Sequence, residues 1–216
     1  TTAIEDGGGT VVFSEFYDPK ATDFSALLDE AASTNPDAVI LIAFDETKTI
    51  IPQAASRNFG PQDVPYFFVD GNLANYSEDF DPGTLTGTKG TLPGAEATDE
   101  FRQRLQDAYG ELTEFAYAGE SYDATILAAL AAVAAEDDSG AGIASQMQAV
   151  STEGTVCTSF AECVELLEAG EDIDYDGVSG KIEFDGNGDP TSASIGIYEY
   201  GDDNTSTPVD FIEGNV

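Results

Sequence analysis

The feature that most constrains the fold is an unbroken apolar run from Ala38 to Phe44, with the sequence AVILIAF. A strand with one face in water alternates polar and apolar residues, whereas a strand covered by helices on both faces does not. A buried helical segment is the alternative, but the short length and the β-branched residues favour a strand. We therefore predict a central, doubly covered strand. Ligands of open α/β sheets bind beyond the carboxyl ends of the strands, which directs attention to Phe44 and Asp45.

Strand-like and helix-like segments alternate around this run. Residues 10–16 and 66–69 are predicted strands. Helical periodicity begins at Asp23 and returns over Thr47–Asn58. The order predicts a βαβαβ unit, and hence an α/β fold with a parallel sheet flanked by helices.

The second half of the chain is predicted to be richer in helices. The longest covers Ser121–Glu136, and its large apolar residues form a broad stripe that must be covered. These residues are Ile126, Leu127, Leu130 and Val133. The other predicted elements are strands over Gly87–Leu92, Gly180–Phe184 and Ser194–Tyr200, and helices over Asp99–Tyr109, Gly142–Val150 and Phe160–Leu167.

The chain is strongly acidic. Its 216 residues include 7 Lys and Arg against 42 Asp and Glu, so the net charge is 7 − 42 = −35. Such a surface repels nucleic acid, which we exclude as a partner. The acids are spread along the chain, which fits an exported protein and a salt-adapted protein equally well. The absence of histidine excludes Ser-His-Asp and Cys-His catalysis.

The two cysteines, Cys157 and Cys163, are six residues apart. This spacing suits a disulfide that closes a small loop better than a metal site, which would need further Cys or His ligands. The alternative is a pair of buried thiols. A disulfide would indicate an oxidising compartment.

Residues 172–183 match the EF-hand calcium-loop pattern. That site requires a helix on each side and an apolar residue at the eighth loop position, which here is Ser179. Residues 180–184 alternate like a strand instead. Chance matches are frequent in a chain this rich in Asp, so we predict no metal site.

The loop Val69-Asp70-Gly71-Asn72 ends a predicted strand at the same sheet edge as Phe44. An acid there suits a ligand ammonium group, and an aromatic wall suits an apolar side chain. The alternative is a turn-forming Asp that caps the short segment after it. Position alone does not separate the two.

Four motifs occur in an order and spacing that together are fairly specific. They are Asp23-Phe24-Ser25, Asn35-Pro36-Asp37-Ala38-Val39, Gly119-Glu120-Ser121-Tyr122-Asp123-Ala124 before an Ala-rich stretch, and GVSGKIEFDGNGD from Gly177 to Asp189. From about Thr10 to Gly201 the chain thus resembles type I solute-binding proteins, and most of all the branched-chain amino-acid receptors of ABC transporters. The resemblance implies a binding protein rather than an enzyme, with no cofactor.

The resemblance also implies two α/β lobes joined by three crossovers, with the ligand in the cleft. Residues 1–115 would form the second lobe without its first strand and helix, residues 116–192 the C-terminal part of the first lobe, and residues 193–216 a return to the second. The family's N-terminal half would be missing, in keeping with Thr1–Gly9, which resembles the end of a helix. That missing portion, or a second copy of the chain, would cover the stripe on residues 121–136.

In the family, two aromatic residues and an acid contact the ligand, and these positions fall on Phe44, Asp70 and Tyr117. Phe44 lacks the hydroxyl common there, and Asp70 is shorter than the usual glutamate. We therefore expect an extracellular or periplasmic receptor, anchored through a preceding segment, that delivers a small amino acid, branched-chain or similar, to a membrane permease. The alternatives are the sensing domain of a signalling receptor or regulator, and a hydrolase that uses two carboxylates.

Overall fold

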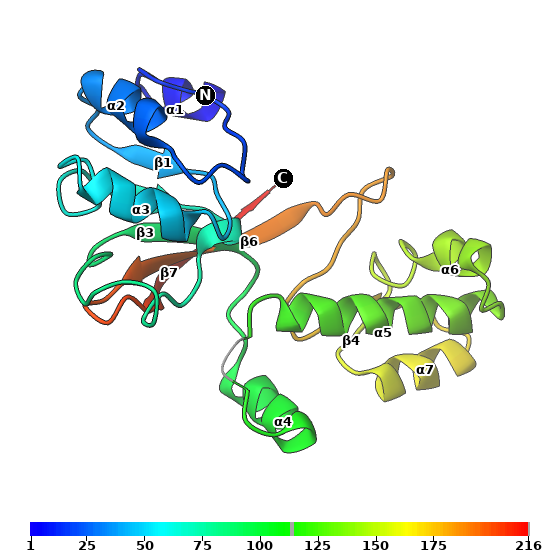
Figure 1. Cartoon of the computed structure of the whole chain (residues 1–216). Helices are drawn as coiled ribbons and strands as arrows, with labels where there is room; N and C mark the ends of the chain where they lie inside the picture. The colour runs from blue at the N-terminus through cyan, green and yellow to red at the C-terminus, as the bar shows by residue number, and fades with distance from the viewer. Residues whose placement is uncertain (113–114, 216) are drawn as a thin grey trace. The chain divides into compact units, whose positions relative to one another are not determined.

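The computed structural model describes residues 1–112 and 115–215. The chain forms two compact units (Figure 1). Unit 1 comprises Thr1–Leu92 and Ile197–Asp210, and unit 2 comprises Pro93–Gly196 and Phe211–Val216. The chain passes from one unit to the other within three strands, β3 (Lys89–Pro93), β6 (Ser192–Tyr200) and β7 (Ser206–Asn215). The lobe boundaries implied by the family resemblance stay a prediction.

A five-stranded sheet has the order β1-β2-β3-β6-β7. Strands β1 (Val39–Leu41) and β2 (Tyr66–Phe68) are parallel, with Val39 opposite Tyr66 and Leu41 opposite Phe68. Strand β3 continues the sheet parallel to β2. The predicted α/β class, a mostly parallel sheet flanked by helices, is confirmed.

Helices α2 (Ser25–Ser33) and α3 (Thr47–Ala55) cover one face of this sheet. On α3, Ile50, Ile51 and Ala54 lie on one side of the helix and are buried in the same cluster as the inward side chains of β1 and β2. Burying a side chain as large as Ile stabilises the fold by roughly 1.5–3 kcal/mol. This packing fixes where the two strands end.

The other face of β1 and β2 is not covered as predicted. Ile40, Ile42 and Phe67 are 51%, 71% and 40% exposed, whereas Leu41 and Ala43 are buried. Strand β1 is also the edge of the sheet rather than its centre. The prediction of a doubly covered central strand is wrong because an apolar run shows only that both faces are apolar. The described chain brings helices to one of them.

The predicted strand over residues 10–16 is also wrong. Within the described chain this segment belongs to no strand, and Val12 and Phe16 are 51% and 103% exposed. A strand exists only through hydrogen bonds to a neighbour, and β1 is paired here with β2 alone. The first residues, which resemble the end of a helix in sequence, form the short helix α1 (Thr2–Asp6).

Unit 2 is mainly helical. Its helices are α4 (Asp99–Tyr109), α5 (Ala118–Ala135), α6 (Gly140–Gln146) and α7 (Phe160–Glu168), and its two parallel strands are β4 (Thr155–Cys157) and β5 (Ile173–Tyr175). Leu127 and Leu130 of α5 are 3% and 0% exposed, because they pack with α6, α7 and β5 in one core. The expectation that this stripe needs another polypeptide is therefore wrong for these two residues. Val133 on the same helix is 38% exposed.

The end of the chain differs from the prediction in two places. In the described chain, residues 180–184 take part only in isolated bridges, Gly177 with Gly180 and Phe184 with Pro190. Strand β7, which we did not predict, follows β6 through a turn in which the Gly201 N–H donates to the Thr205 carbonyl at 3.0 Å. Alternating polar and apolar residues indicate a preference for extended backbone, but a sheet forms only where a neighbouring strand is available for pairing.

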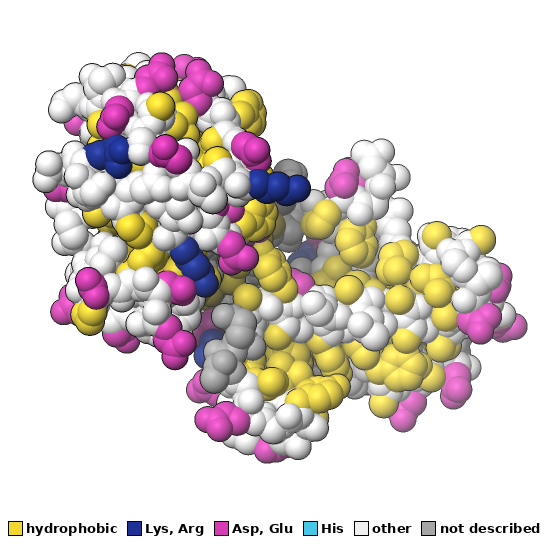
Figure 2. Space-filling view, in the orientation of Figure 1, with side chains coloured by type: hydrophobic (Ala, Val, Ile, Leu, Met, Phe, Trp, Pro, Cys, Tyr) yellow, Lys and Arg dark blue, Asp and Glu magenta, His cyan; other side chains and the backbone are white. Residues whose placement is uncertain are grey.

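The surface carries the expected excess of carboxylates, which Figure 2 shows scattered over the visible face among few Lys and Arg side chains. In the part of the chain that the structure describes, no helix has both the length and the apolar character needed to cross a membrane.

The predicted disulfide is confirmed. Cys157 at the end of β4 is bonded to Cys163 in α7, with their Cα atoms 5.4 Å apart. Both cysteines are fully buried within the core of unit 2. The bond thus fastens α7 to the small sheet.

Replacing both cysteines by Ser is predicted to lower the free energy of unfolding by about 2 kcal/mol, because a short loop constrains the unfolded chain only modestly. Urea unfolding of the variant and of the oxidised protein measures the difference. Alkylation of the unmutated protein without reductant should add no mass, and intact-mass measurement of that sample confirms that the disulfide is present in the reference protein. An unchanged urea midpoint would contradict the prediction.

Candidate functional site

The carboxyl ends of β1 and β2 bring two predicted ligand residues together in unit 1. Phe44 lies just beyond β1 and is 67% exposed. Asp70 opens the short 3-10 helix η1 (Asp70–Asn72) beyond β2 and is exposed. A Cβ on Gly71 would lie 2.8 Å from both the Ala43 carbonyl oxygen and Cε1 of the Phe44 ring. Only glycine fits at this position without a shift of its neighbours, and Asp70 directly precedes it in the sequence.

Asn72 ties the two strand ends together and is fully buried. Its Oδ1 accepts a hydrogen bond from the Val69 N–H at 2.9 Å, and its Nδ2 donates to the Leu41 carbonyl at 3.2 Å. Both backbone groups lie where the strand ladder ends and need another partner. Asn72 therefore holds the Asp70 turn against the end of β1.

Two tyrosines support this end of the sheet. The Tyr76 hydroxyl donates to the Asn72 carbonyl at 3.0 Å, and burial raises the pKa of Tyr76 to about 12, which keeps it a donor. The Tyr17 hydroxyl lies 2.9 Å from the Ile42 carbonyl and 2.9 Å from the Glu46 carboxylate. Burial, and then the bond to Glu46, raise the pKa of Tyr17. The sequence analysis missed Asn72, Tyr76 and Tyr17, because their partners are remote or backbone groups that no motif displays.

Tyr117, the third predicted ligand residue, lies in unit 2 at the start of α5. It is 40% exposed and has the left-handed backbone angles φ 57° and ψ 13°, which are uncommon for a residue other than glycine. In the first turn of α5, the Glu120 carboxylate accepts a hydrogen bond from the Ala95 N–H at 3.0 Å. A non-glycine residue in this conformation is a feature that concentrates at functional sites.

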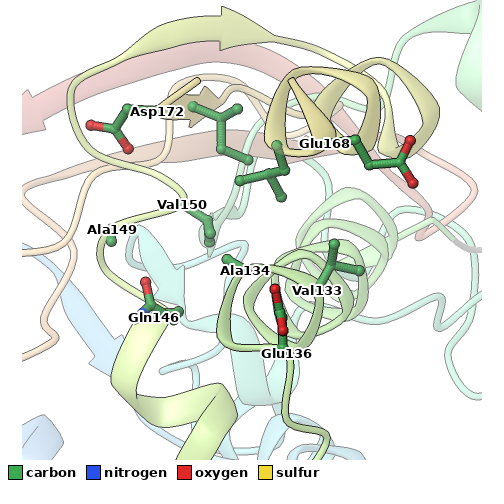
Figure 3. Close-up of a pocket in the computed structure, with 10 residues that line it drawn as sticks. Val133, Ala134, Glu136, Gln146, Ala149, Val150, Glu168 and Asp172 are labelled. Atoms are coloured by element: carbon green, nitrogen blue, oxygen red, sulfur yellow. The ribbon is translucent and has the colours of Figure 1, made fainter. Parts of the chain in front are cut away.

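A pocket of about 440 Å³ lies elsewhere in unit 2 (Figure 3). Its apolar lining includes Val133 and Val150, and the carboxylates of Glu168 and Asp172 point away from each other. A ligand site is expected to have polar groups that converge on one point. The pocket contains none of the three predicted ligand residues, and we do not assign the ligand to it.

The EF-hand-like segment has a different geometry from a calcium loop. Residues 173–175 form β5, and all three side chains of this strand, Asp174 included, are buried. Burial, followed by the charge of Asp176, raises the pKa of Asp174. Among the described residues, no group of three or more His, Cys, Asp or Glu side chains is placed to hold a metal ion.

Comparison with known proteins places this arrangement in a family. The model of the family described as periplasmic binding protein matches residues 1–204. The chain belongs to this family. A search of curated proteins gave no significant match.

Solved structures of similar fold include three that were described by their ligands or transport systems. They are the leucine-binding protein LivK of Thermotoga maritima (21% identity, TM-score 0.72, 98% of this chain and 54% of that chain), a branched-chain amino-acid ABC transporter ligand-binding protein of Burkholderia xenovorans (14%, 0.62, 97% and 52%), and a solute-binding protein of Rhodopseudomonas palustris in complex with p-hydroxybenzoic acid (13%, 0.67, 100% and 55%). At these identities the likeness shows the fold. This periplasmic binding protein chain spans about half the length of each of them.

Replacing Asn72 by Ala is predicted to lower the free energy of unfolding by about 2–3 kcal/mol, because it leaves buried backbone groups at both strand ends without a partner. Asn75→Ala is the matched control, since Asn75 is exposed and its side chain accepts a local hydrogen bond from the Ser77 N–H. It should change stability by less than about 0.5 kcal/mol. Urea unfolding measures both variants, and equal effects would show that Asn72 does not tie the strands.

Proposed function

We propose that the protein is the extracellular substrate-binding component of an ABC transporter, which binds a small amino acid and delivers it to a membrane permease. The observation that carries the proposal is that Phe44 and Asp70 both follow the carboxyl ends of two parallel strands, where Gly71, next to Asp70, closely approaches the Phe44 ring. This is the edge of an α/β sheet at which ligands bind.

Each of the proposed ligand residues has a distinct role. The Asp70 carboxylate pairs with the ammonium group of the ligand in a charge-assisted hydrogen bond. The exposed Phe44 ring covers an apolar side chain of the ligand, and Tyr117 supplies a second aromatic contact from unit 2. An acid and aromatic walls together favour a zwitterion with an apolar side chain.

The ligands named for two solved structures of similar fold suggest two kinds of ligand to compare. One is described as leucine-binding, and another was crystallised with p-hydroxybenzoic acid. The aromatic acid has no ammonium group, so Asp70 would repel its carboxylate rather than pair with it. We therefore favour an amino acid, branched-chain or similar, over an aromatic acid.

The proposed location is outside the cytoplasmic membrane, where we propose that a membrane anchor holds the protein. Its support is the family membership together with the Cys157–Cys163 bond, since disulfides persist in oxidising compartments. The partners are then the amino acid, the permease, and the portion of the family fold that this chain does not span.

The proposal is tested on the natural full-length protein by calorimetry with L-leucine, L-isoleucine, L-valine and p-hydroxybenzoate. We expect one of the amino acids to bind and the aromatic acid not to bind. Recovery of the ligand chemically unchanged separates a receptor from a hydrolase, and loss of uptake in cells lacking the gene separates a transporter component from a sensor. Binding of no amino acid would refute the proposal.

Asp70→Ala is predicted to weaken amino-acid binding about tenfold or more, since a hydrogen bond to a charged group contributes roughly 1.5–3 kcal/mol. Asp37→Asn is the control, because Asp37 is an exposed acid at the opposite end of β1 and its loss removes the same charge. Calorimetry should show near wild-type affinity for the control. An unchanged affinity for Asp70→Ala would remove this residue from the site.

A further inference from the structure

One carboxylate in unit 2 stands apart from the acidic surface. Asp123 on α5 is 1% exposed, although the chain places most of its acids in water. Its Oδ1 accepts hydrogen bonds from the Tyr175 hydroxyl at 2.8 Å and the Val178 N–H at 3.1 Å. Its Oδ2 accepts from the Ser179 N–H at 2.7 Å and the Ser179 hydroxyl at 2.6 Å. All four donors are neutral, so the carboxylate is held by geometry rather than by a counter-charge.

The turn that supplies these donors is built to approach the carboxylate closely. A Cβ on Gly177 would overlap the Asp123 carboxylate, so only glycine fits there. Burial, and then the bond to Asp123, raise the pKa of Tyr175, which therefore stays protonated as a donor. The turn of residues 177–179 is thus clamped to α5.

The same turn reaches the beginning of α5. A Cβ on the buried Gly119 would be in ordinary contact with Ser179, 3.5 Å from its Cβ. Gly119 lies two residues after Tyr117, whose carbonyl accepts the helical hydrogen bond from the Ser121 N–H at 3.0 Å. On another side of this first turn, Glu120 is held by the Ala95 N–H. The direction of the Tyr117 side chain therefore depends on how the first turn of α5 is held.

We propose that Asp123 is a positioning residue of the ligand site: by clamping the turn of residues 177–179 against the first turn of α5, it fixes Tyr117 for contact with the ligand. This rests on the proposed function, in which Tyr117 touches the amino acid. A purely structural role for Asp123 would stabilise unit 2 and leave the orientation of Tyr117 unchanged, and this difference can be measured.

Asp123→Asn is the informative substitution because it keeps the size of the side chain and replaces one acceptor oxygen with an NH2 donor. That donor would face the N–H or O–H groups that now point at the carboxylate, so the turn should detach. Ser179→Ala is milder, since it removes one of the four hydrogen bonds and leaves both backbone donors. Val150→Ala is the matched control, because Val150 is 2% exposed in the same core and its apolar side chain takes no part in the hydrogen bonds to Asp123.

The chain contains no Trp, so Tyr117→Trp introduces a single fluorescent reporter at the position in question. In this background, Asp123→Asn should increase acrylamide quenching and lower the fluorescence anisotropy, whereas Val150→Ala should reduce stability without changing either signal. Ser179→Ala should shift both signals in the same direction by less, and it replaces Asp123→Asn if the latter does not fold. Unchanged quenching and anisotropy in a cooperatively folded variant would overturn the proposal.

A double-mutant cycle with Tyr117→Ala links the clamp to the ligand. In the natural full-length protein, Asp123→Asn should weaken L-leucine binding about tenfold when Tyr117 is present, which corresponds to about 1.4 kcal/mol, and should add no further loss in Tyr117→Ala. Additive effects would overturn the proposal. If the wild-type protein binds no amino acid, the proposed function fails, and the Trp reporter still decides whether Asp123 positions residue 117.

Discussion

The structure depends on buried polar side chains that satisfy backbone groups where helices and strands end. A buried N–H or carbonyl without a partner is costly, so every end of an element inside the core must be matched. Asn72 does this for the ends of β1 and β2. Asn204, which is 1% exposed, accepts from the Leu85 N–H at 3.0 Å and donates to the carbonyl of Asp81 at 2.9 Å. Asp123 does the same for the turn that follows β5. Each of these three side chains fixes a loop against the core, and the turn tied by Asn72 carries Asp70.

The acidic residues of the chain fall into a large solvated group and a few whose surroundings differ. With 42 acids against 7 bases, most carboxylates have no cation to pair with, and the ion pairs that do form, such as Lys48 with Asp79, are partly exposed and contribute little. Among so many acids, a functional carboxylate is recognised by its surroundings. Asp123 is buried under neutral donors, and Glu120 is held by a backbone N–H. These two differ from the solvated majority in environment and not in residue type, whereas Asp70 is exposed and differs only in its place at the sheet edge.

The arrangement also explains how a sheet and a helix terminus contribute to one proposed binding function. Helices α2 and α3 pack on one face of the sheet, so Phe44 and Asp70 follow strands that the core supports. The start of α5 is held from two sides, which offers Tyr117 a defined direction. In both cases the proposed contact residues lie at the ends of regular elements, where the neighbouring backbone is supported by packing or hydrogen bonds.

The sequence by itself determined the α/β class, the parallel pairing around the run of residues 38–44, the disulfide and the family, because periodicity, spacing and motif order are local properties. It also placed Phe44 and Asp70 at one sheet edge, since parallel strands share that edge. Only the tertiary structure decided which face of β1 is covered, that residues 10–16 form no strand, and that Leu127 packs within this chain. Only the structure shows that Asn72 links the ends of β1 and β2 and that Asp123 links α5 to the turn of residues 177–179. Each of these features depends on contacts between groups that are far apart in the sequence. The type of a residue shows that its side chain can be buried or can form a hydrogen bond, but it does not identify the partner.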